Sequence, residues 1–219
     1  LMEYWKRYSP QLFVTASHAT QFNLEMPFGK GLIVSGNNRF YALDKKQFRE
    51  FTTFLRGVLF NGKEDDLLSF LNRIKAPVIE TRPVPAVWVA AGNCLIGDAK
   101  KTKNSMAVTA LSRYGFNQLV GYTVPSWYGK GGWGTLGLLF SNHDASSLAE
   151  AWYLNNQFIL DETMTRFPKL MDVHFNSPDI NGIKNDPDFA RGMNSAGYGM
   201  GKDQLGLIHD RDTVAFYGD

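Results

Sequence analysis

The chain has little of three features that would assign it to a specialised class of protein. Its 219 residues include one cysteine, Cys94, so no disulfide can form within the chain. No apolar run approaches the roughly 20 residues that a membrane helix requires. The net charge of +2 is small, and the lysines and arginines are dispersed. These absences argue against a disulfide scaffold, a membrane span and a nucleic-acid partner.

What is present is a globular composition with many aromatic residues. Hydrophobic residues make up 44% of the chain and charged residues 20%, which is close to the average of globular proteins. Sixteen Phe, nine Tyr and five Trp indicate a thick core, a substrate groove or both. The length fits one α/β domain, so we expect residues 1–219 to form a single domain.

Strand-like apolar runs alternate with segments of helical periodicity along the chain. We expect strands at residues 12–16, 86–91, 116–124 and 213–217, and helices at residues 2–8, 45–58, 67–74, 105–114 and 146–166. Residues 21–44 are expected to form loops and short strands, residues 61–66 a turn, and residues 125–134 a loop rich in glycine and tryptophan. Residues 168–204 are polar and rich in Gly, Pro and Asn. The alternation predicts a three-layer α/β/α fold with a mostly parallel sheet covered on both faces.

A candidate nucleophile and a candidate base each follow one of the expected strands. His18 comes after the run at residues 12–16, and Cys94 comes after the run at residues 86–91. In parallel sheets, reactive groups gather at the carboxyl ends of the strands, so two neighbouring strands would bring these side chains together. An imidazole beside a thiol makes the sulfur a competent nucleophile at neutral pH. Gly92 and Gly97 would allow a tight turn and a close approach of substrate to the backbone.

Each residue alone also has a structural interpretation. A lone cysteine on a buried strand is more often a small core residue than a nucleophile, and a histidine at a strand end is more often structural. Cys94, however, follows its apolar run in a glycine-flanked turn and does not lie within the run. The matching positions of Cys94 and His18 therefore favour catalysis.

The residues around both positions resemble a known family. Ser17-His18-Ala19-Thr20 and Asn93-Cys94-Leu95-Ile96-Gly97 are similar to the paired histidine and cysteine signatures of the caspase-hemoglobinase clan of cysteine peptidases. The expected helix at residues 106–111, the strand ending in Gly121-Tyr122-Thr123-Val124-Pro125, and Ser126-Trp127-Tyr128-Gly129 resemble the gingipain branch, as does the closing segment 214–219. The resemblance covers about residues 10–160 and 212–219.

The resemblance implies a caspase-like fold and a cysteine endopeptidase that cleaves peptides or proteins. Cys94 would form an acyl-enzyme, and His18 would act as general acid and base. The backbone around Ala19 and Asn93–Cys94 would form the oxyanion hole. Pro125, Ser126 and Trp127 would line the substrate pocket. Glu25 could orient His18, or Glu25 or Asp98 could give the pocket an acidic floor.

Two residues depart from the family pattern. The family usually has glycine after the histidine, where this chain has Ala19, and a small residue before the cysteine, where it has Asn93. These departures keep a second interpretation open, in which the chain is a catalytically degenerate peptidase-like domain that binds a peptide or serves as a structural module.

The sequence gives no strong signal for a metal or another cofactor, and none is expected. Residues 209–212, His-Asp-Arg-Asp, lack a second histidine at the helical spacing of a zinc site. They are expected to form a polar approach to the last strand. Asp179, Asn181, Asp186 and Asp188 could supply oxygen ligands to calcium, but their order does not match an EF-hand loop.

The resemblance also predicts more chain than is present before the histidine strand. In the caspase-like fold, one or two β–α units normally precede that strand. We therefore expect an N-terminal part of the domain to belong to a longer protein or to be supplied as a separate segment of it. The compartment stays open, with an exported or periplasmic bacterial location favoured over the cytoplasm.

Overall fold

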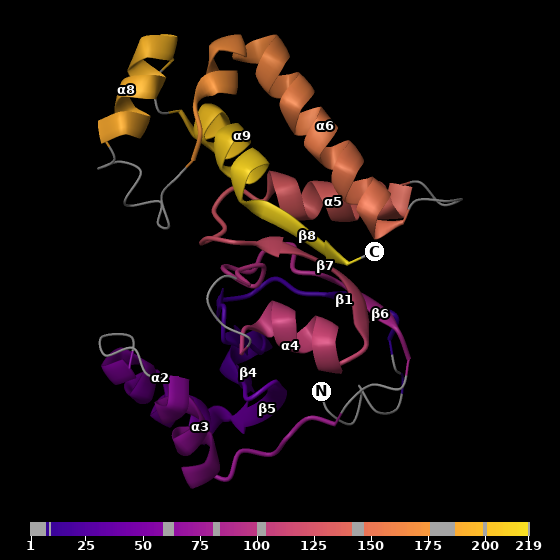
Figure 1. Cartoon of the computed structure of the whole chain (residues 1–219), viewed down its shortest axis with the longest axis vertical. Coiled ribbons are helices and arrows are strands. Elements are labelled where there is room, and N and C mark those ends of the chain that lie inside the picture. The colour runs from indigo at the N-terminus through magenta and orange to yellow at the C-terminus, as the bar shows by residue number, and fades with distance from the viewer. Residues whose placement is uncertain are drawn as a thin grey trace.

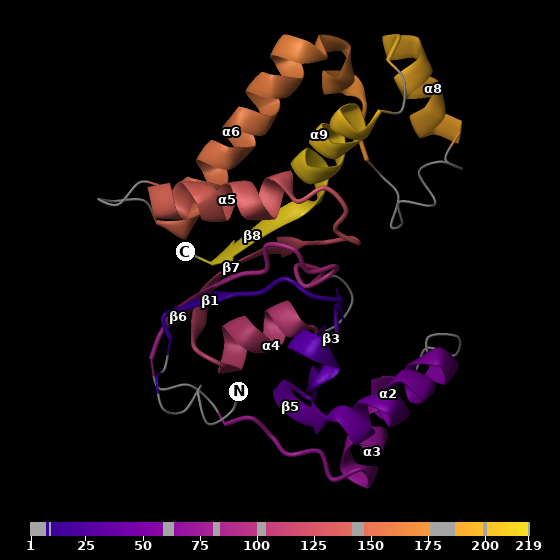
Figure 2. The same ribbon diagram turned by 180° about the vertical axis from the view of Figure 1, so that it is seen from behind.

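Two four-stranded sheets form the framework of the protein, which is represented by a computed structural model (Figures 1 and 2). The structure describes residues 8, 10–58, 64–80, 84–99, 104–141, 147–175, 187–198 and 201–218. The helix expected at residues 2–8 lies outside this range except for Tyr8. None of the helices described is both long and apolar enough to cross a lipid bilayer.

The first sheet, sheet A, contains the four strands expected from the sequence. Its order is β1 (Leu12–Val14), β6 (Ala86–Val89), β7 (Phe116–Tyr122) and β8 (Val214–Gly218). The first three strands are parallel, and β8 pairs with β7 in the antiparallel direction. The prediction of an α/β protein with a mostly parallel sheet is therefore confirmed. Strands β1, β6 and β7 each end two residues before the end of their apolar run, although backbone hydrogen bonds from Thr15 to Val89 and from Ala90 to Val120 continue the pairing.

Helices cover both faces of sheet A because its strands are apolar on both sides. Val89 and Ala91 pack with Leu136 of α5 (Lys130–Ser141) and Leu148 of α6 (Leu148–Arg166). The intervening residues, Trp88 and Ala90, face α4 (Met106–Arg113). Figures 1 and 2 show α5, α6 and α9 (Lys202–Thr213) on one side of the sheet and α4 on the other.

The second sheet, sheet B, is a complete antiparallel meander where only loops and short strands were expected. Its strands are β2 (Ala19–Thr20), β3 (Asn23–Glu25), β4 (Gly31–Gly36) and β5 (Arg39–Asp44), paired in that order. A 3₁₀ turn, η1 (Pro27–Gly29), connects β3 to β4. All six residues of β4 are buried, so its sequence lacks the apolar–polar alternation that identifies a half-exposed strand.

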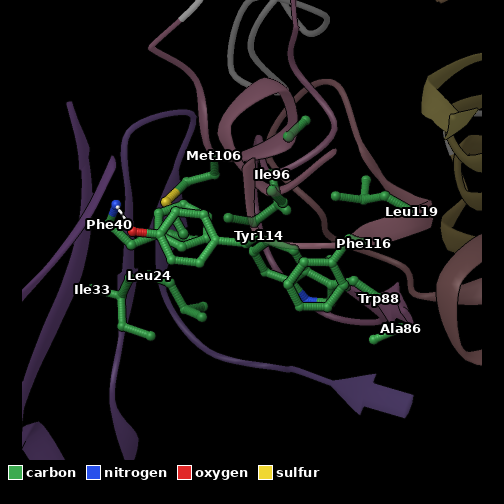
Figure 3. Packing of buried hydrophobic residues seen from close by; sticks show 14 of the residues in the cluster. Leu24, Ile33, Phe40, Ala86, Trp88, Ile96, Met106, Tyr114, Phe116 and Leu119 are labelled. Carbon is green, nitrogen blue, oxygen red and sulfur yellow. Dashed lines mark hydrogen bonds between the residues drawn. The ribbon is translucent and has the colours of Figure 1, made fainter. Parts of the chain in front are cut away.

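Sheet B lies between two hydrophobic clusters. On one side, Leu24, Ile33 and Phe40 join the core of sheet A and α4, and Figure 3 shows Phe40 and Met106 beside Tyr114 in this core. On the other side, Leu32, Val34 and Leu43 pack against α2 (Lys45–Val58) and α3 (Glu64–Arg73). Helix α2 has the predicted bounds. Helix α3 begins at Glu64, inside the segment that was predicted to be a turn.

Three helices occupy segments that the sequence did not identify as helical. Helix α5 begins at Lys130, inside the expected glycine-rich loop, because its glycines allow close packing. A Cβ added at Gly132 would lie 2.3 Å from the carbonyl oxygen of Ala91. A second 3₁₀ turn, η2 (Pro168–Asp172), and helices α8 (Pro187–Ala196) and α9 lie in and beyond the polar stretch at residues 168–204. Their buried residues form a separate cluster around Leu170.

Candidate functional site

Three loops meet at the carboxyl edge of sheet A. Strand β6 lies between β1 and β7, and all three run in the same direction, so the loops that follow them leave from one edge. The loop after β1 carries His18, the loop after β6 carries Cys94, and the loop after β7 carries Ser126 and Trp127. The Cys94 loop is therefore flanked by the other two.

The His18 and Cys94 loops are joined by hydrogen bonds centred on Asn93. The side-chain amide of Asn93 donates to the carbonyl oxygen of Ser17 at 2.8 Å and to the Ser17 hydroxyl at 3.2 Å. Its side-chain oxygen accepts from the Thr15 hydroxyl at 2.5 Å. The backbone of Gly92 donates to the Thr15 carbonyl. Asn93 is completely buried, so its side chain links the two loops and does not face a substrate.

The bond network continues from Asn93 into the centre of the sheet. The Thr15 hydroxyl accepts a hydrogen bond of 2.8 Å from the indole nitrogen of Trp88, a fully buried residue of β6. The Ser17 hydroxyl donates to the carbonyl oxygen of Glu25 in β3. The loop that carries His18 is thus bonded to β6, to the Cys94 loop and to sheet B. The sequence predicted a backbone role for Asn93 in the oxyanion hole and a departure from the family pattern, but not the linking role of its side chain.

Cys94 lies in a strained turn, partly accessible to solvent. Its sulfur is 3.8 Å from the Ser126 hydroxyl and 4.0 Å from the Ser126 carbonyl oxygen, so it is not packed into an apolar core. The next residue, Leu95, has a φ of 59°, which is uncommon for a residue with a branched side chain. Strained backbone of this kind clusters at active sites and ligand clamps.

His18 is exposed and stands opposite Glu25. The carbonyl oxygen of His18 accepts a hydrogen bond of 2.9 Å from the backbone of Glu25. Residues directly opposite each other on antiparallel strands project to the same face, so the side chains of His18 and Glu25 share a side of the pair. In the part of the chain that the structure describes, no hydrogen bond joins the His18 ring to the Cys94 sulfur or to the Glu25 carboxylate.

Ala19 places its side chain and its backbone N–H in different surroundings. Its side chain belongs to the core cluster between the two sheets, so the methyl group is directed away from the loops. Because residues 18 and 25 form a hydrogen-bonded pair, Ala19 and Leu24 form the non-hydrogen-bonded pair that alternates with it. The backbone N–H of Ala19 therefore points away from β3.

Aromatic residues line the surface beside the Cys94 loop. Trp127, predicted to line a pocket, is 57% exposed. Trp133 on α5 was missed because its segment was expected to be a loop. A Cβ built on Gly92 would lie 3.5 Å from the Trp133 indole nitrogen, so Trp133 lies directly beside that loop. A hollow of about 520 Å³ extends from Tyr128 and Trp133 to Phe158 on α6.

The two glycines around Cys94 have different roles. Gly92 lies between Ala16 and Trp133, where a Cβ would be in close contact with both. Gly97 packs directly on β7, because a Cβ there would lie 2.3 Å from the carbonyl oxygen of Gly121. The prediction that Gly97 gives substrate close access is therefore wrong, since the neighbouring strand already occupies that space.

Asp98 lies near β8. The Tyr217 hydroxyl donates to the Gly97 carbonyl oxygen at 2.6 Å. Burial, and then the negative charge of Asp98, raises the pKa of Tyr217. Asp98 therefore lies close enough to Tyr217 to influence its pKa. Tyr217 is in β8, the edge strand of sheet A opposite β1.

His209 and Asp210 form a buried polar pair beneath the loop after β7. His209 Nδ1 is 2.7 Å from Asp210 Oδ1, and His209 Nε2 is 3.0 Å from the Pro125 carbonyl oxygen. Asp210 Oδ2 accepts from the Gly131 backbone at 2.9 Å and from the Tyr122 hydroxyl at 3.2 Å. Burial, and then the charge of Asp210, raises the pKa of Tyr122. The expected polar approach to β8 is instead part of helix α9 and is buried.

The described residues contain no group of three or more His, Cys, Asp or Glu side chains placed to hold a metal ion. Of the four candidate calcium ligands, Asp179, Asn181 and Asp186 lie outside the described residues. Asp188 is on α8 and pairs with Arg191. His174 lies 3.5 Å from Asp212, whose carboxylate also binds Arg211.

Comparison of the chain with family models, with curated proteins and with solved structures finds no match.

Proposed function

We propose that the protein is a cysteine endopeptidase with Cys94 as nucleophile and His18 as general acid and base. The observation that carries the proposal is the joining of their two loops by Asn93 at one edge of sheet A. An accessible sulfur beside a strained residue, and an exposed imidazole on the adjacent loop, meet the requirements of this chemistry. A caspase-like fold is part of the same proposal, and the mixed α/β architecture is consistent with it.

The proposed reaction proceeds through an acyl-enzyme. The Cys94 thiolate attacks the carbonyl carbon of the scissile peptide bond, and the oxygen takes up negative charge. The carbon–nitrogen bond then breaks as the His18 imidazolium gives a proton to the leaving amine. Water, deprotonated by His18, attacks the thioester carbon. The carboxylic acid product leaves, and the Cys94–His18 pair is restored.

Two backbone N–H groups are proposed as the oxyanion hole. Among the described residues, none accepts a hydrogen bond from the backbone N–H of Cys94, and the N–H of Ala19 points away from β3. Both are available to a developing negative charge. The methyl group of Ala19 packs in the core, so its presence in place of glycine does not block this arrangement.

The remaining predicted residues have supporting roles in this proposal. Glu25 is opposite His18, where its carboxylate can reach the imidazole by a side-chain rotation and orient it. Ser126 is next to the Cys94 sulfur, and exposed Trp127 follows it, so this loop would form one wall of the pocket for the peptide. Pro125, the residue before Ser126, would form the first part of this wall.

Labelling and turnover test the proposal together. We expect Cys94 in the wild-type protein to react with iodoacetamide faster than free glutathione does at the same pH, and peptide-library cleavage to stop in Cys94→Ala. His18→Ala should slow both labelling and cleavage by about 100-fold or more. Gln11→Ala, at an exposed position before β1, is a control that keeps both the imidazole and the hydrogen bonds of Asn93. A Cys94 thiol no more reactive than glutathione, with cleavage unchanged in Cys94→Ala, would contradict the proposal.

One observation favours a second candidate, a degenerate peptidase-like module that binds a peptide without cleaving it. The Cys94 sulfur faces Ser126, and no hydrogen bond connects it to the His18 ring within the described residues. For this candidate we expect library peptides to bind with equal affinity to the wild type and to Cys94→Ala, and to be recovered intact.

A further inference from the structure

We infer that the buried His209–Asp210 pair is a clamp that holds the loop at residues 125–131 against the Cys94 site, making both residues positioning residues. The clamp itself follows from the hydrogen bonds of α9, whereas its consequence for peptide binding rests on the proposed function. No contact of either residue with substrate is required.

The pair bonds to both ends of the loop. His209 Nε2 contacts the carbonyl oxygen of Pro125 at 3.0 Å, where the loop begins. Asp210 Oδ2 accepts from the backbone N–H of Gly131 at 2.9 Å, in the first turn of α5, where the loop ends. The carboxylate at this position also interacts favourably with the positive end of the α5 dipole. Two adjacent residues of one helix therefore fix both ends of the loop.

The bonding pattern defines the charges of the pair. The other polar partners of Asp210 are donors, the Gly131 amide and the Tyr122 hydroxyl, as an ionised carboxylate requires. With Asp210 ionised, each ring nitrogen of His209 faces an oxygen that accepts, one from Asp210 and one from Pro125. A neutral imidazole has one N–H and would leave one of these contacts unmade. The imidazolium donates to both, so we infer that the pair is a buried ion pair.

Aromatic rings enclose the imidazole and exclude water. The rings of Tyr128 and Phe175 meet it edge-on, with centroids 5.5 and 4.9 Å away, and the ring of Tyr122 lies 5.9 Å away. Among the residues that the structure describes, the titratable groups shown to face His209 are Asp210 on its own helix, Tyr122 on β7 and Tyr128 in the clamped loop. His209 is 1% exposed and Asp210 is fully buried. Removing one charge would leave the other buried and unpaired, which is strongly unfavourable.

The clamped loop carries a residue that contacts the Cys94 sulfur. Ser126 follows Pro125 directly, and its hydroxyl is 3.8 Å from that sulfur. Tyr128 is held between His209 and Gly206 of α9, where a Cβ on the glycine would lie 3.1 Å from the tyrosine ring. Loosening the clamp would shift Ser126–Tyr128 without changing the His18 or Cys94 loops. A peptide would bind less well, while the intrinsic reactivity of the sulfur would persist.

Nuclear magnetic resonance tests the charge state directly in the intact chain. With ¹⁵N-labelled histidine, we expect one of the four histidines to carry protons on both ring nitrogens at neutral pH. This signal should be absent from His209→Gln. A His209 signal with one unprotonated nitrogen would overturn the ion pair.

Hydrogen exchange and two electrophiles test the clamp. In His209→Gln and Asp210→Asn, we expect the amides of residues 127–131 to exchange about tenfold faster or more. Labelling of Cys94 by a peptidyl electrophile should slow by about 10- to 100-fold, whereas labelling by iodoacetamide should stay within about twofold. Ile208→Val, at a buried neighbouring position on α9, is the control for general destabilisation. It should change neither the exchange rates of residues 127–131 nor the relative labelling rates of the two electrophiles.

The outcomes separate the clamp from the proposed function. If His209→Gln fails to fold, hydrogen exchange in Asp210→Asn still tests the clamp, and the wild-type histidine resonances still test the ion pair. If the wild type resists the peptidyl electrophile, the endopeptidase proposal fails, but exchange at residues 127–131 still reports on the clamp. Unchanged amide exchange at residues 127–131 in both folded variants would overturn the clamp.

Discussion

At the scale of single residues, Asn93 determines how the two reactive loops meet. A small residue at position 93 would leave the two loops without this link. Here a fully buried amide makes three hydrogen bonds to Thr15 and Ser17. A buried polar group of this kind favours one arrangement over others, because every alternative leaves donors and acceptors without partners.

Replacing Asn93 should separate stability from catalytic geometry. In Asn93→Ala we expect the free energy of unfolding to fall by about 1–3 kcal/mol, because Thr15 and Ser17 lose buried partners. Labelling of Cys94 by a peptidyl electrophile should slow by about 10- to 100-fold, because the His18 loop is released. Urea unfolding and labelling kinetics measure the two effects.

The matched control for Asn93 is Ser35, which is also fully buried. Its hydroxyl bonds to Thr109 at 2.6 Å and to the Ser105 carbonyl, away from the site loops. Ser35→Ala should lower stability by a similar amount and leave labelling unchanged. If both variants slow labelling equally, Asn93 acts only through global stability.

At the scale of elements, local patterns predicted those segments whose signals lie close together in the chain. Helix α2 shows its apolar face at Phe48, Phe51 and Phe54, and its bounds were predicted from that spacing. Helix α4 ends before Gly115, whose φ of 72° is the left-handed conformation that commonly ends a helix. Helix α5 was missed because glycine weakens a helix locally, and the packing that compensates comes from β6 and β8.

The capping box of α6 should contribute measurably to stability. The Glu150 backbone donates to the Ser147 hydroxyl at 3.2 Å, and the Ser147 backbone donates to the Glu150 carboxylate at 2.8 Å. In Ser147→Ala we expect the free energy of unfolding to fall by about 1 kcal/mol, as measured by urea denaturation. Ser141→Ala, at the exposed end of α5, removes a hydroxyl that caps no helix start and should be close to neutral. Equal effects of the two variants would argue against the box.

At the scale of the whole molecule, two buried tyrosines and one half-buried tyrosine connect distant parts of the chain. The Tyr114 hydroxyl donates to the Ile79 carbonyl at 2.7 Å and accepts from the Phe40 backbone at 2.8 Å, the bond drawn in Figure 3. Tyr122 reaches α9, and Tyr217 bonds to the Gly97 loop. Burial is the main cause that raises the pKa of each of these three phenols.

These tyrosines predict a loss of stability in alkali. Because their pKa values are raised in the folded state, their stabilising contribution is complete below about pH 10, the pKa of an unfolded tyrosine. It is lost as the pH rises further toward the folded-state values, since the unfolded chain then releases protons more readily. We expect urea midpoints to fall steadily above about pH 10.

Two phenylalanine variants make this prediction specific. Tyr114→Phe should lower stability at neutral pH, through its lost hydrogen bonds, and should also flatten the alkaline decline. Tyr153→Phe, at an exposed position on α6, should follow the wild type. A midpoint that stays constant well above pH 10 in the wild type would contradict the prediction.

The sequence by itself determined the features that depend on neighbours in the chain. Apolar runs placed the four strands of sheet A. Helical spacing placed α2, and serine caps marked the start of α6. The position of His18 and Cys94 after their runs brought both to one sheet edge. The tertiary structure alone decided which side chains connect these segments. Asn93 meets Thr15 78 residues away, and His209 meets Pro125 84 residues away. No local pattern encodes such pairs, because their stabilisation arises only when folding removes water from both partners at once.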